Sequence, residues 1–254
     1  MAHPTVAVFE YHLVGYRRVW IGTVVSSLAT PVLFFLGLGV IMGSYVDRNG
    51  ALDIPYLHFL ASGLLVSTGL QIAMTESGLP VLSHFKWERI YFGVAAAPPR
   101  VADMILGRLG YISLRVAIAA IAFLVVMVPF GAVASVWAVL LPAIAVLVGL
   151  AGAAPMFAYA ATVNGANVMT VMLRFGMLPM TLFSGVFFPV GQLPVVLQPV
   201  AYALPLWHGV ELSRAASLGV APALAVPVHI GVLVLWFVVG YALAHARFTR
   251  RLAV

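Results

Sequence analysis

The sequence predicts an all-α integral membrane protein that crosses the bilayer six times. The chain is 63% hydrophobic and only 8% charged, whereas an ordinary soluble domain is about 25% charged. A soluble chain of 254 residues would need far more polar side chains to cover its exterior. The bilayer must therefore act as the solvent for much of the surface, and it admits helices whose backbone groups are satisfied internally.

Six apolar runs are long enough to span, because about 20 helical residues cross the hydrocarbon core. We expect the spans at 22–43, 57–77, 103–128, 135–161, 170–188 and 224–246, within a single domain of residues 1–254. The segments between them carry turn chemistry rather than apolar periodicity, as at Ser44–Pro55, Pro129–Gly131 and Asn164–Asn167. Gly39 and Gly43 form a GxxxG pattern in the first span, which usually indicates close helix packing.

Residues 5–20 precede the first span and have a helical pattern of their own. Four apolar side chains fall within an arc of roughly 60° at 100° per residue: Phe9, Leu13, Tyr16 and Trp20. This pattern favours a helix in the membrane plane, with its aromatic side chains at the headgroup level. The alternative is the cytoplasmic start of the first span. We prefer the interfacial helix because Gly15 and Gly22 interrupt a continuous rod, and because Arg17 and Arg18 would be costly in lipid.

A short segment between the second and third spans is rich in charge. Six of the charged residues fall between His84 and Arg108: Lys86, Glu88, Arg89, Arg100, Asp103 and Arg108. In a chain that is mostly hydrocarbon, such a segment must lie in water or against another protein. The loop 84–102 is therefore a candidate contact surface.

The distribution of Lys and Arg predicts the orientation of the chain. An even number of spans places both termini on one side. That side holds nine basic residues: Arg17, Arg18, Lys86, Arg89, Arg100, Arg108, Arg247, Arg250 and Arg251. The opposite side holds only Arg48 and Arg214. We expect a multi-pass protein of the cell membrane with both termini in the cytoplasm.

The segment 189–222 contains five prolines but is nearly all apolar. It is too interrupted to span and too hydrophobic for a free extracellular loop. Short reentrant helices that dip into the outer leaflet and pack against protein satisfy both constraints. The alternative is a short fifth span followed by an ordinary proline-rich loop.

Motifs for catalysis and cofactor binding are absent from the sequence. The phosphate-binding pattern GxxxxGK[ST] requires a lysine after glycine, and the only lysine, Lys86, lies in HFKWER. There is no HExxH, no histidine pair at metal-ligand spacing and no cysteine. The basic residues are scattered between apolar runs and form no nucleic-acid groove. We expect no catalytic residue, no metal site, no bound cofactor and no nucleic-acid partner.

Four segments carry a resemblance to a known family: 33–46 (LFFLGLGVIMGSYV), 85–108 (FKWERIYFGVAAAPPRVADMILGR), 182–194 (LFSGVFFPVGQLP) and 204–215 (LPLWHGVELSRA). In this order around six spans, the chain resembles the permease subunits of ABC type-2 exporters. It is most similar to the lipo-oligosaccharide (nodulation-factor) branch, with daunorubicin-type drug exporters as near relatives.

The resemblance implies partners. In this family the N-terminal segment is a connecting helix, and the loop between the second and third spans forms a coupling helix. Both dock on a separately encoded ATP-binding subunit, present in two copies, which binds ATP and Mg. The implied contact residues are Glu10, Arg17, Lys86, Glu88, Arg89, Pro98, Pro99 and Arg100. The family commonly has Thr-Pro where this chain has Ala97-Pro98, which leaves the contact residues open.

The resemblance also implies a dimer with a second copy of this permease or a close paralogue, and an outer hairpin that closes the path. We expect the path between the first, second and fifth spans, lined by Gln71, Glu76, Met177, Met180 and Phe183. A carboxylate in a span is a functional candidate by default, although Glu76 could equally be solvated or paired with a nearby arginine. The methionines could be ordinary packing residues.

The predicted function is an ATP-driven exporter permease that moves amphipathic or lipid-linked cargo outward: a lipo-oligosaccharide, a glycolipid or a hydrophobic drug. Membrane lipid surrounds such a chain. One alternative is a secondary transporter, which usually shows inverted repeats with matching helix breaks. Another is an integral-membrane enzyme that acts on lipids, which requires a polar catalytic cluster at one membrane face. Neither feature is evident in the sequence.

Overall fold

The structure is a computed structural model that describes residues 3–48, 52, 54–95 and 100–253. These residues form helices and turns, with no strand among them. Six helical segments within the described ranges are long and apolar enough to cross a membrane. They are Trp20–Arg48, Tyr56–Lys86, Val101–Phe130, Val136–Ala160, Ala166–Phe183 and Val226–Leu252. The predicted all-α class and the six candidate spans are therefore confirmed.

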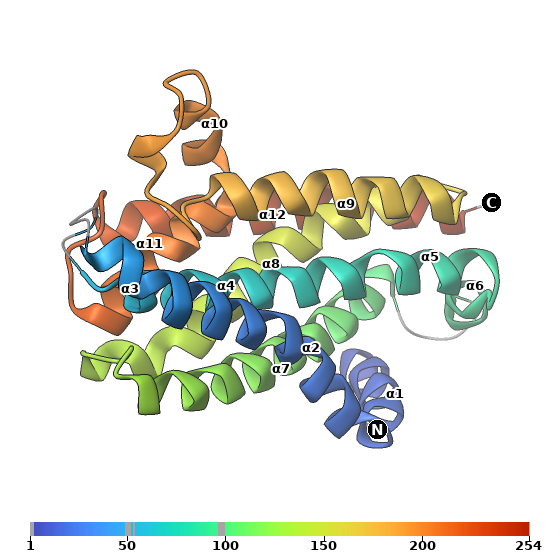
Figure 1. The fold of residues 1–254 in the computed structure, drawn as a ribbon. Coiled ribbons are helices and arrows are strands. Elements are labelled where there is room, and N and C mark those ends of the chain that lie inside the picture. Colours follow the sequence, from blue (N-terminus) through green and yellow to red (C-terminus); the bar gives the residue numbers. More distant parts are fainter. Residues whose placement is uncertain (1–2, 49–51, 53, 96–99, 254) are drawn as a thin grey trace.

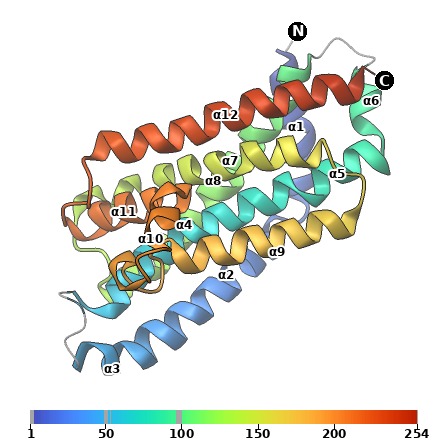
Figure 2. The ribbon, with the colours of Figure 1, turned by 90° about the horizontal axis from the view of Figure 1, so that it is seen from above.

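The spans run lengthwise beside one another, and the two ends of the bundle differ (Figure 1). Both termini lie at the same end as α5 (Leu79–Lys86) and α6 (Ile90–Ala95). The opposite end holds α3 (Gly43–Arg48) and α11 (Pro205–Leu218), and the view from above shows the same division (Figure 2). We call the first the terminal end and the second the distal end.

The N-terminal segment folds into α1 (Pro4–Arg17), which is separate from α2 (Trp20–Phe34). His3 caps α1, because its side chain accepts a hydrogen bond from the Thr5 amide and Pro4 occupies the first turn. The sequence predicted that Gly15 and Gly22 interrupt the helix. This prediction is wrong, since both glycines lie inside helices. The chain leaves the helix at Val19, with φ −128° and ψ 7°, because short i→i−3 hydrogen bonds tighten the end of α1.

The first span combines α2, the π-helix η1 (Phe35–Met42) and α3. Gly39 is buried in η1 against the start of α4 (Tyr56–Ser77). A Cβ at Gly39 would come within 2.6 Å of Leu57 Cδ1, and Gly43 faces the same turn of α4. The GxxxG pattern therefore marks the close helix contact that the sequence indicated.

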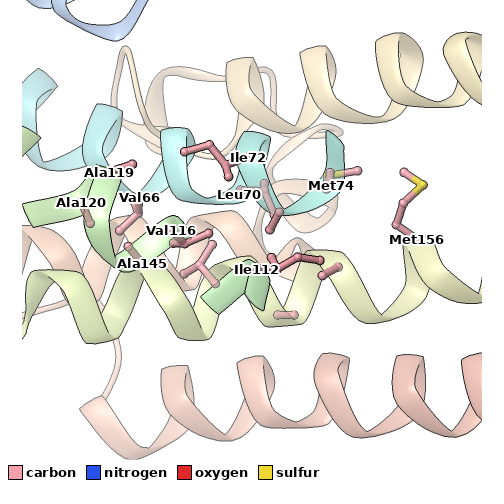
Figure 3. Packing of buried hydrophobic residues seen from close by; sticks show 14 of the residues in the cluster. Val66, Leu70, Ile72, Met74, Ile112, Val116, Ala119, Ala120, Ala145 and Met156 are labelled. Carbon is pink, nitrogen blue, oxygen red and sulfur yellow. The ribbon is translucent and has the colours of Figure 1, made fainter. Parts of the chain in front are cut away.

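The second span forms the centre of the bundle. It packs against α7 (Val101–Met127), α8 (Leu141–Ala160) and α11, and most residues of α4 are buried. Small residues allow this close approach: a Cβ at Gly69 would lie 3.2 Å from Ala145 Cβ, and one at Gly149 would lie 3.2 Å from Ala73 Cβ. Figure 3 shows side chains of α4, α7 and α8 directed into the shared core, among them Val66, Leu70, Ile112, Val116 and Ala145.

The fifth span, α9 (Ala166–Phe183), begins and ends earlier than the expected 170–188. It ends where Gly185 adopts φ +78°, a left-handed conformation that turns the chain. Arg214 of α11 secures this turn, because its Nη2 donates to the Gly185 carbonyl at 2.9 Å and its guanidinium lies 3.7 Å from the centre of the Phe59 ring.

The proline-rich segment after this turn forms short helices at the distal end: η4 (Val190–Gln192), α10 (Gln198–Ala203) and α11. Val190, Leu193, Ala201 and Trp207 form a small buried cluster that holds the segment together. α11 contacts α4, α8 and α12 (Val226–Leu252). α11 therefore packs against the bundle, whereas the part with α10 projects from it (Figure 1), and Val195, Val196 and Val200 are exposed.

The segment 84–102, where the resemblance implied a coupling helix, contains the end of α5 and the short helix α6. α5 continues α4 after a break at Gly78 and ends at Lys86, and α6 follows two residues after Glu88. Phe85 and Tyr91 pack against Phe248 of α12, so this corner is anchored to the last span. Pro98 and Pro99 lie outside the described residues.

The contact between α12 and α8 provides a test of the fold. A Cβ at Gly240 would lie 2.5 Å from Pro155 Cδ and 2.6 Å from Pro155 N, whereas a Cβ at Gly231 of the same helix meets nothing within 4 Å. We expect Gly240→Ala to lower the free energy of unfolding by about 1–3 kcal/mol, the usual cost of overpacking. Gly231→Ala should be neutral or slightly stabilising. Thermal unfolding in detergent would measure both, and equal melting temperatures would contradict this packing.

Candidate functional site

An apolar cavity of about 530 Å³ lies between the first, second and fifth spans. It has walls from α2, η1, α4 and α9, and the turn after α9 reaches its distal side. Most of its lining is aromatic or aliphatic, including Phe34, Leu38, Met42, Leu178 and Phe187. These spans are the three that the sequence placed around a transport path.

A smaller polar cavity of about 200 Å³ continues the apolar one. The two share Thr30, Thr68, Gln71 and Met177. The smaller cavity adds further hydroxyl groups and an ion pair: Ser26, Ser27, Thr75, Glu76 and Arg115. The groove formed by both cavities therefore changes from hydrocarbon to polar along its length, which suits a molecule with one apolar and one polar end.

Glu76 is the centre of an ion cluster between α4 and α7. Its side chain pairs with Arg115 through Oε1 and Nη1 and lies 3.4 Å from Arg108 Nη2 through Oε2. Arg108 Nη2 also donates to the Glu76 carbonyl at 3.0 Å. Arg108 is only 3% exposed, so this charge is compensated inside the protein. Of the two readings of Glu76 that the sequence left open, the structure shows the pairing with nearby arginines.

The helix α1 contacts this cluster directly. Arg108 Nη1 lies 3.3 Å from His12 Nδ1, and because arginine can only donate, the imidazole accepts. Burial lowers the pKa of His12 to about 3, and the positive charge of Arg108 and the neighbouring His84 ring act in the same direction. His12 is therefore neutral at pH 7 and can accept this bond. The Arg115 guanidinium lies 5.5 Å from the centre of the Tyr16 ring, within cation–π distance.

The start of α1 is fixed to the start of α7. Thr5 Oγ1 donates to Asp103 Oδ1 at 2.6 Å, while Asp103 Oδ2 accepts from the Arg100 amide at 2.9 Å. One turn further along α7, the two helices approach so closely that a Cβ at Gly107 would lie 2.7 Å from the Thr5 carbonyl oxygen. The apolar face of α1 thus packs on protein, with Phe9 beside Gly110 and Tyr16 buried. Trp20, predicted on the same face, belongs to α2 and is exposed.

The described residues proposed to contact a partner are all exposed and lie on α1, on the α5–α6 corner and at the start of α7: Glu10, Arg17, Lys86, Glu88, Arg89 and Arg100. Several are held in place locally. Lys86 Nζ donates to the Asn164 carbonyl, Glu88 accepts from Ser83, and Arg89, directly before α6, has φ +54°. Pro98 and Pro99 cannot be placed, because they lie outside the described residues.

The candidate path residues divide into two groups. Gln71 and Met177 line both cavities, and Glu76 lines the polar one. Met180 packs against the main core, and Phe183 packs against the small cluster around Trp207. Met180 and Phe183 are not among the described residues that line either cavity.

Sequence reasoning did not assign a role to Arg108, Arg115, His12 or Tyr16 in this site. The sequence does contain a signal for the ion cluster, because Arg108 and Arg115 are seven residues apart and lie on one face of a helix. Glu76 provides the opposite charge near the same end of the preceding span. Two consecutive spans with charges at matching depth indicate an ion cluster between them.

The sequence profile of the ABC-2 type transporter family matches residues 5–218. The chain belongs to this family. It is 28% identical over 249 residues to Nodulation protein J of Rhizobium leguminosarum bv. trifolii, and 30% identical over 249 residues to Nodulation protein J of Sinorhizobium fredii. Both alignments cover 97% of this chain and 93% of the relative. Inner membrane transport permease YadH of Escherichia coli K12 is 27% identical over 238 residues, with coverage of 89% and 87%.

These findings confirm the predicted class of protein. The chain is a multi-pass membrane permease of a family whose transport subunits carry no ATPase domain of their own. Membership of the family implies an ATP-binding partner subunit. The groove between the spans and the ion cluster are thus features of a transport subunit.

The docking of α1 on α7 can be tested with two glycines one turn apart. Gly107→Ala forces α1 away, because the Cβ would meet backbone at 2.7 Å, whereas a Cβ at Gly110 would meet the Phe9 ring at an ordinary 3.4 Å. We expect Gly107→Ala to increase the rate of trypsin cleavage at Arg17 and Arg18 several-fold, because cleavage follows local undocking. Gly110→Ala should leave the rate unchanged. Equal rates in both variants would show that α1 does not depend on this contact.

Proposed function

We propose that this chain is the permease of an ATP-driven exporter that moves amphipathic or lipid-linked cargo outward across the cytoplasmic membrane. The observation that carries the proposal is the groove between the first, second and fifth spans, in which an apolar cavity of about 530 Å³ joins a polar one. An ion or a small polar solute would gain little from such an apolar wall. A molecule with a hydrocarbon tail and a hydroxyl-bearing head would find contacts for both parts.

The cargo classes that fit are a lipo-oligosaccharide, a glycolipid and a hydrophobic drug. The resemblance to nodulation-type permeases over nearly the whole chain supports the first. The hydroxyl and amide groups of Thr30, Thr68 and Gln71 support the first two, because they can hydrogen-bond sugar hydroxyls. A purely hydrophobic drug would use the apolar cavity alone.

The groove is open on one side in the single chain, and its walls α2 and α9 are largely exposed. In the first span and in the fifth, only 17% of an apolar 18-residue stretch is buried within the chain. A second copy of this permease, or a close paralogue, would cover that side and complete the path. Exposed apolar residues of these two spans, such as Ile21, Val25 and Phe175, fit a contact with protein or with lipid.

The energy for transport comes from an ATP-binding subunit in two copies, which binds ATP and Mg. Its proposed docking surface is formed by α1 and the α5–α6 corner, where Glu10, Arg17, Glu88 and Arg89 are exposed. Closure of the partner on ATP would push these helices and tilt the spans as rigid bodies.

The proposed orientation places the terminal end of the bundle in the cytoplasm. This end carries α1, α6 and the C-terminus (Figures 1 and 2), and therefore most of the basic residues. Arg48 and Arg214 lie on α3 and α11 at the distal end. The excess of basic charge on the cytoplasmic side is the usual determinant of orientation.

Charge reversal tests the docking surface. We expect the double variant Glu88→Arg/Arg89→Glu to insert normally but to lower the permease-dependent stimulation of the partner's ATPase about tenfold, the effect of about 1.4 kcal/mol of lost coupling. Arg247→Glu, which is exposed on α12 near the same end, is the matched control and should retain stimulation. The measurement is ATP hydrolysis by the complex in proteoliposomes. Native stimulation in the double variant would mean that the partner docks elsewhere.

Single cysteines test the orientation, because the chain has no cysteine of its own. Val220 lies in the distal loop between α11 and α12, and Val94 lies in α6 at the terminal end. In intact cells, a membrane-impermeant thiol reagent should label Val220→Cys and not Val94→Cys. In inside-out vesicles the pattern should be reversed. Labelling of Val94→Cys in intact cells would place the termini outside.

A further inference from the structure

A third cavity lies at the terminal end, and we call it the terminal cleft. It has a volume of about 790 Å³ and is formed by α1, the start of α2, the end of α4 with α5, and α7. Tyr11, Tyr16 and Arg18 are among the residues that line it. The terminal cleft and the polar cavity of the groove have only Glu76 and Arg115 in common among the described lining residues. The ion pair therefore lies at the boundary between the two spaces.

The position of this boundary is also visible along α2. Thr23 lines the terminal cleft, whereas Ser27 lines the polar cavity. The two residues are one helical turn apart, or about 6 Å along the axis, and lie on the same side of α2. A molecule that moved from the cleft into the groove would pass along α2 from Thr23 to Ser27, and on this way it would meet the Glu76–Arg115 pair.

We propose that the Glu76–Arg115 pair is the inner gate of the cargo path and that α1 holds this gate shut through Tyr16. The proposal rests on the proposed function, since it assigns a role to the terminal end of the transport groove. When the pair is formed, the side chains of Glu76 and Arg115 occupy the boundary between the terminal cleft and the polar cavity. When it separates, the terminal cleft and the polar cavity become one space.

The surroundings of the pair favour a reversible contact. Separation of a buried ion pair is costly mainly because a charge is left without a partner. Glu76 has a second cation, because Arg108 lies against both its carboxylate and its backbone carbonyl. The carboxylate therefore remains compensated when Arg115 moves. Arg115 remains near the Tyr16 ring and the terminal cleft, where water can solvate it.

The same contacts link the gate to α1. Tyr16 lies against Arg115, and His12 accepts from Arg108, so one helix touches both cations of the cluster. A displacement of α1 acts on both contacts at once, without any deformation inside the spans. Because α1 belongs to the proposed docking surface, the partner's movement would reach the gate through a single rigid element.

The test uses one thiol on each side of the gate. Ser27→Cys reports on the polar cavity and Thr23→Cys on the terminal cleft, and the chain has no other cysteine. A membrane-impermeant thiol reagent is added to inside-out vesicles that contain the permease alone. Lipid or a second copy covers the open side of the groove, so the reagent reaches Ser27→Cys only through the cleft.

We expect Glu76→Gln and Arg115→Gln each to increase the labelling rate of Ser27→Cys about tenfold or more, because loss of one charge strongly destabilises a buried pair. Labelling of Thr23→Cys should be unchanged in the same backgrounds. Tyr16→Leu, which keeps the ion pair and removes only the ring beneath Arg115, should give a smaller increase at Ser27→Cys.

Three other outcomes would each overturn the proposal or a part of it. Unchanged labelling of Ser27→Cys in both charge variants would show that the pair is not a gate. An equal increase at Thr23→Cys would show general loosening of the terminal end instead. An increase with the charge variants but none with Tyr16→Leu would remove α1 from the mechanism. The labelling needs neither cargo nor the ATP-binding subunit, so a failure of the proposed export function would appear separately, in the ATPase and transport assays.

Discussion

The close approach of α4 to α7 and α8 is the contact on which the rest of the structure depends. In a bilayer the helices gain no hydrophobic free energy from association, so small residues and polar contacts must hold them together. Gly69 and Ala73 let α4 meet Val116, Ala145 and Gly149 at van der Waals distance. Glu76 continues this face of α4 two turns later and meets the arginines of α7. The groove-facing residues lie roughly 100–160° around the helix from Gly69 at 100° per residue: Thr68, Gln71 and Thr75.

This arrangement explains how one helix can support both a tight core and a transport path. The small-residue face fixes α4 in place, and the polar face is then left for the groove against α2 and α9. The change from hydrocarbon to polar lining follows from the order of residues along the first span and α4. In the first span, Phe34 and Leu38 come after Ser27 and Thr30, and on α4, Leu64 comes before Gln71, Thr75 and Glu76. Both spans thus place polar residues toward the terminal end.

The number of candidate spans and their helical nature could be predicted from sequence, because span length and composition are set by the thickness of the bilayer. The positions at which helices end were harder to predict. Gly15 and Gly22 suggested an interruption by propensity, but tertiary contacts of Tyr16 with α7 fix α1 up to Arg17. The role of Glu76 was undecidable from one sequence, since pairing requires the rotation of α7 relative to α4. Whether Met177 or Met180 lines the groove likewise depends on the rotation of α9 about its axis, which one sequence does not define.

The low burial of α2 and α9 within a single chain has a consequence for assembly. Two of the three walls of the groove obtain little packing from their own bundle, so in the proposed dimer much of their stability is supplied by the neighbouring copy. The stability of such a protein depends on its concentration in the membrane. A copy without a partner would present loosely held first and fifth spans to proteases of the membrane. Cells would therefore hold the permease at levels set by pairing, and unpaired copies would be degraded first.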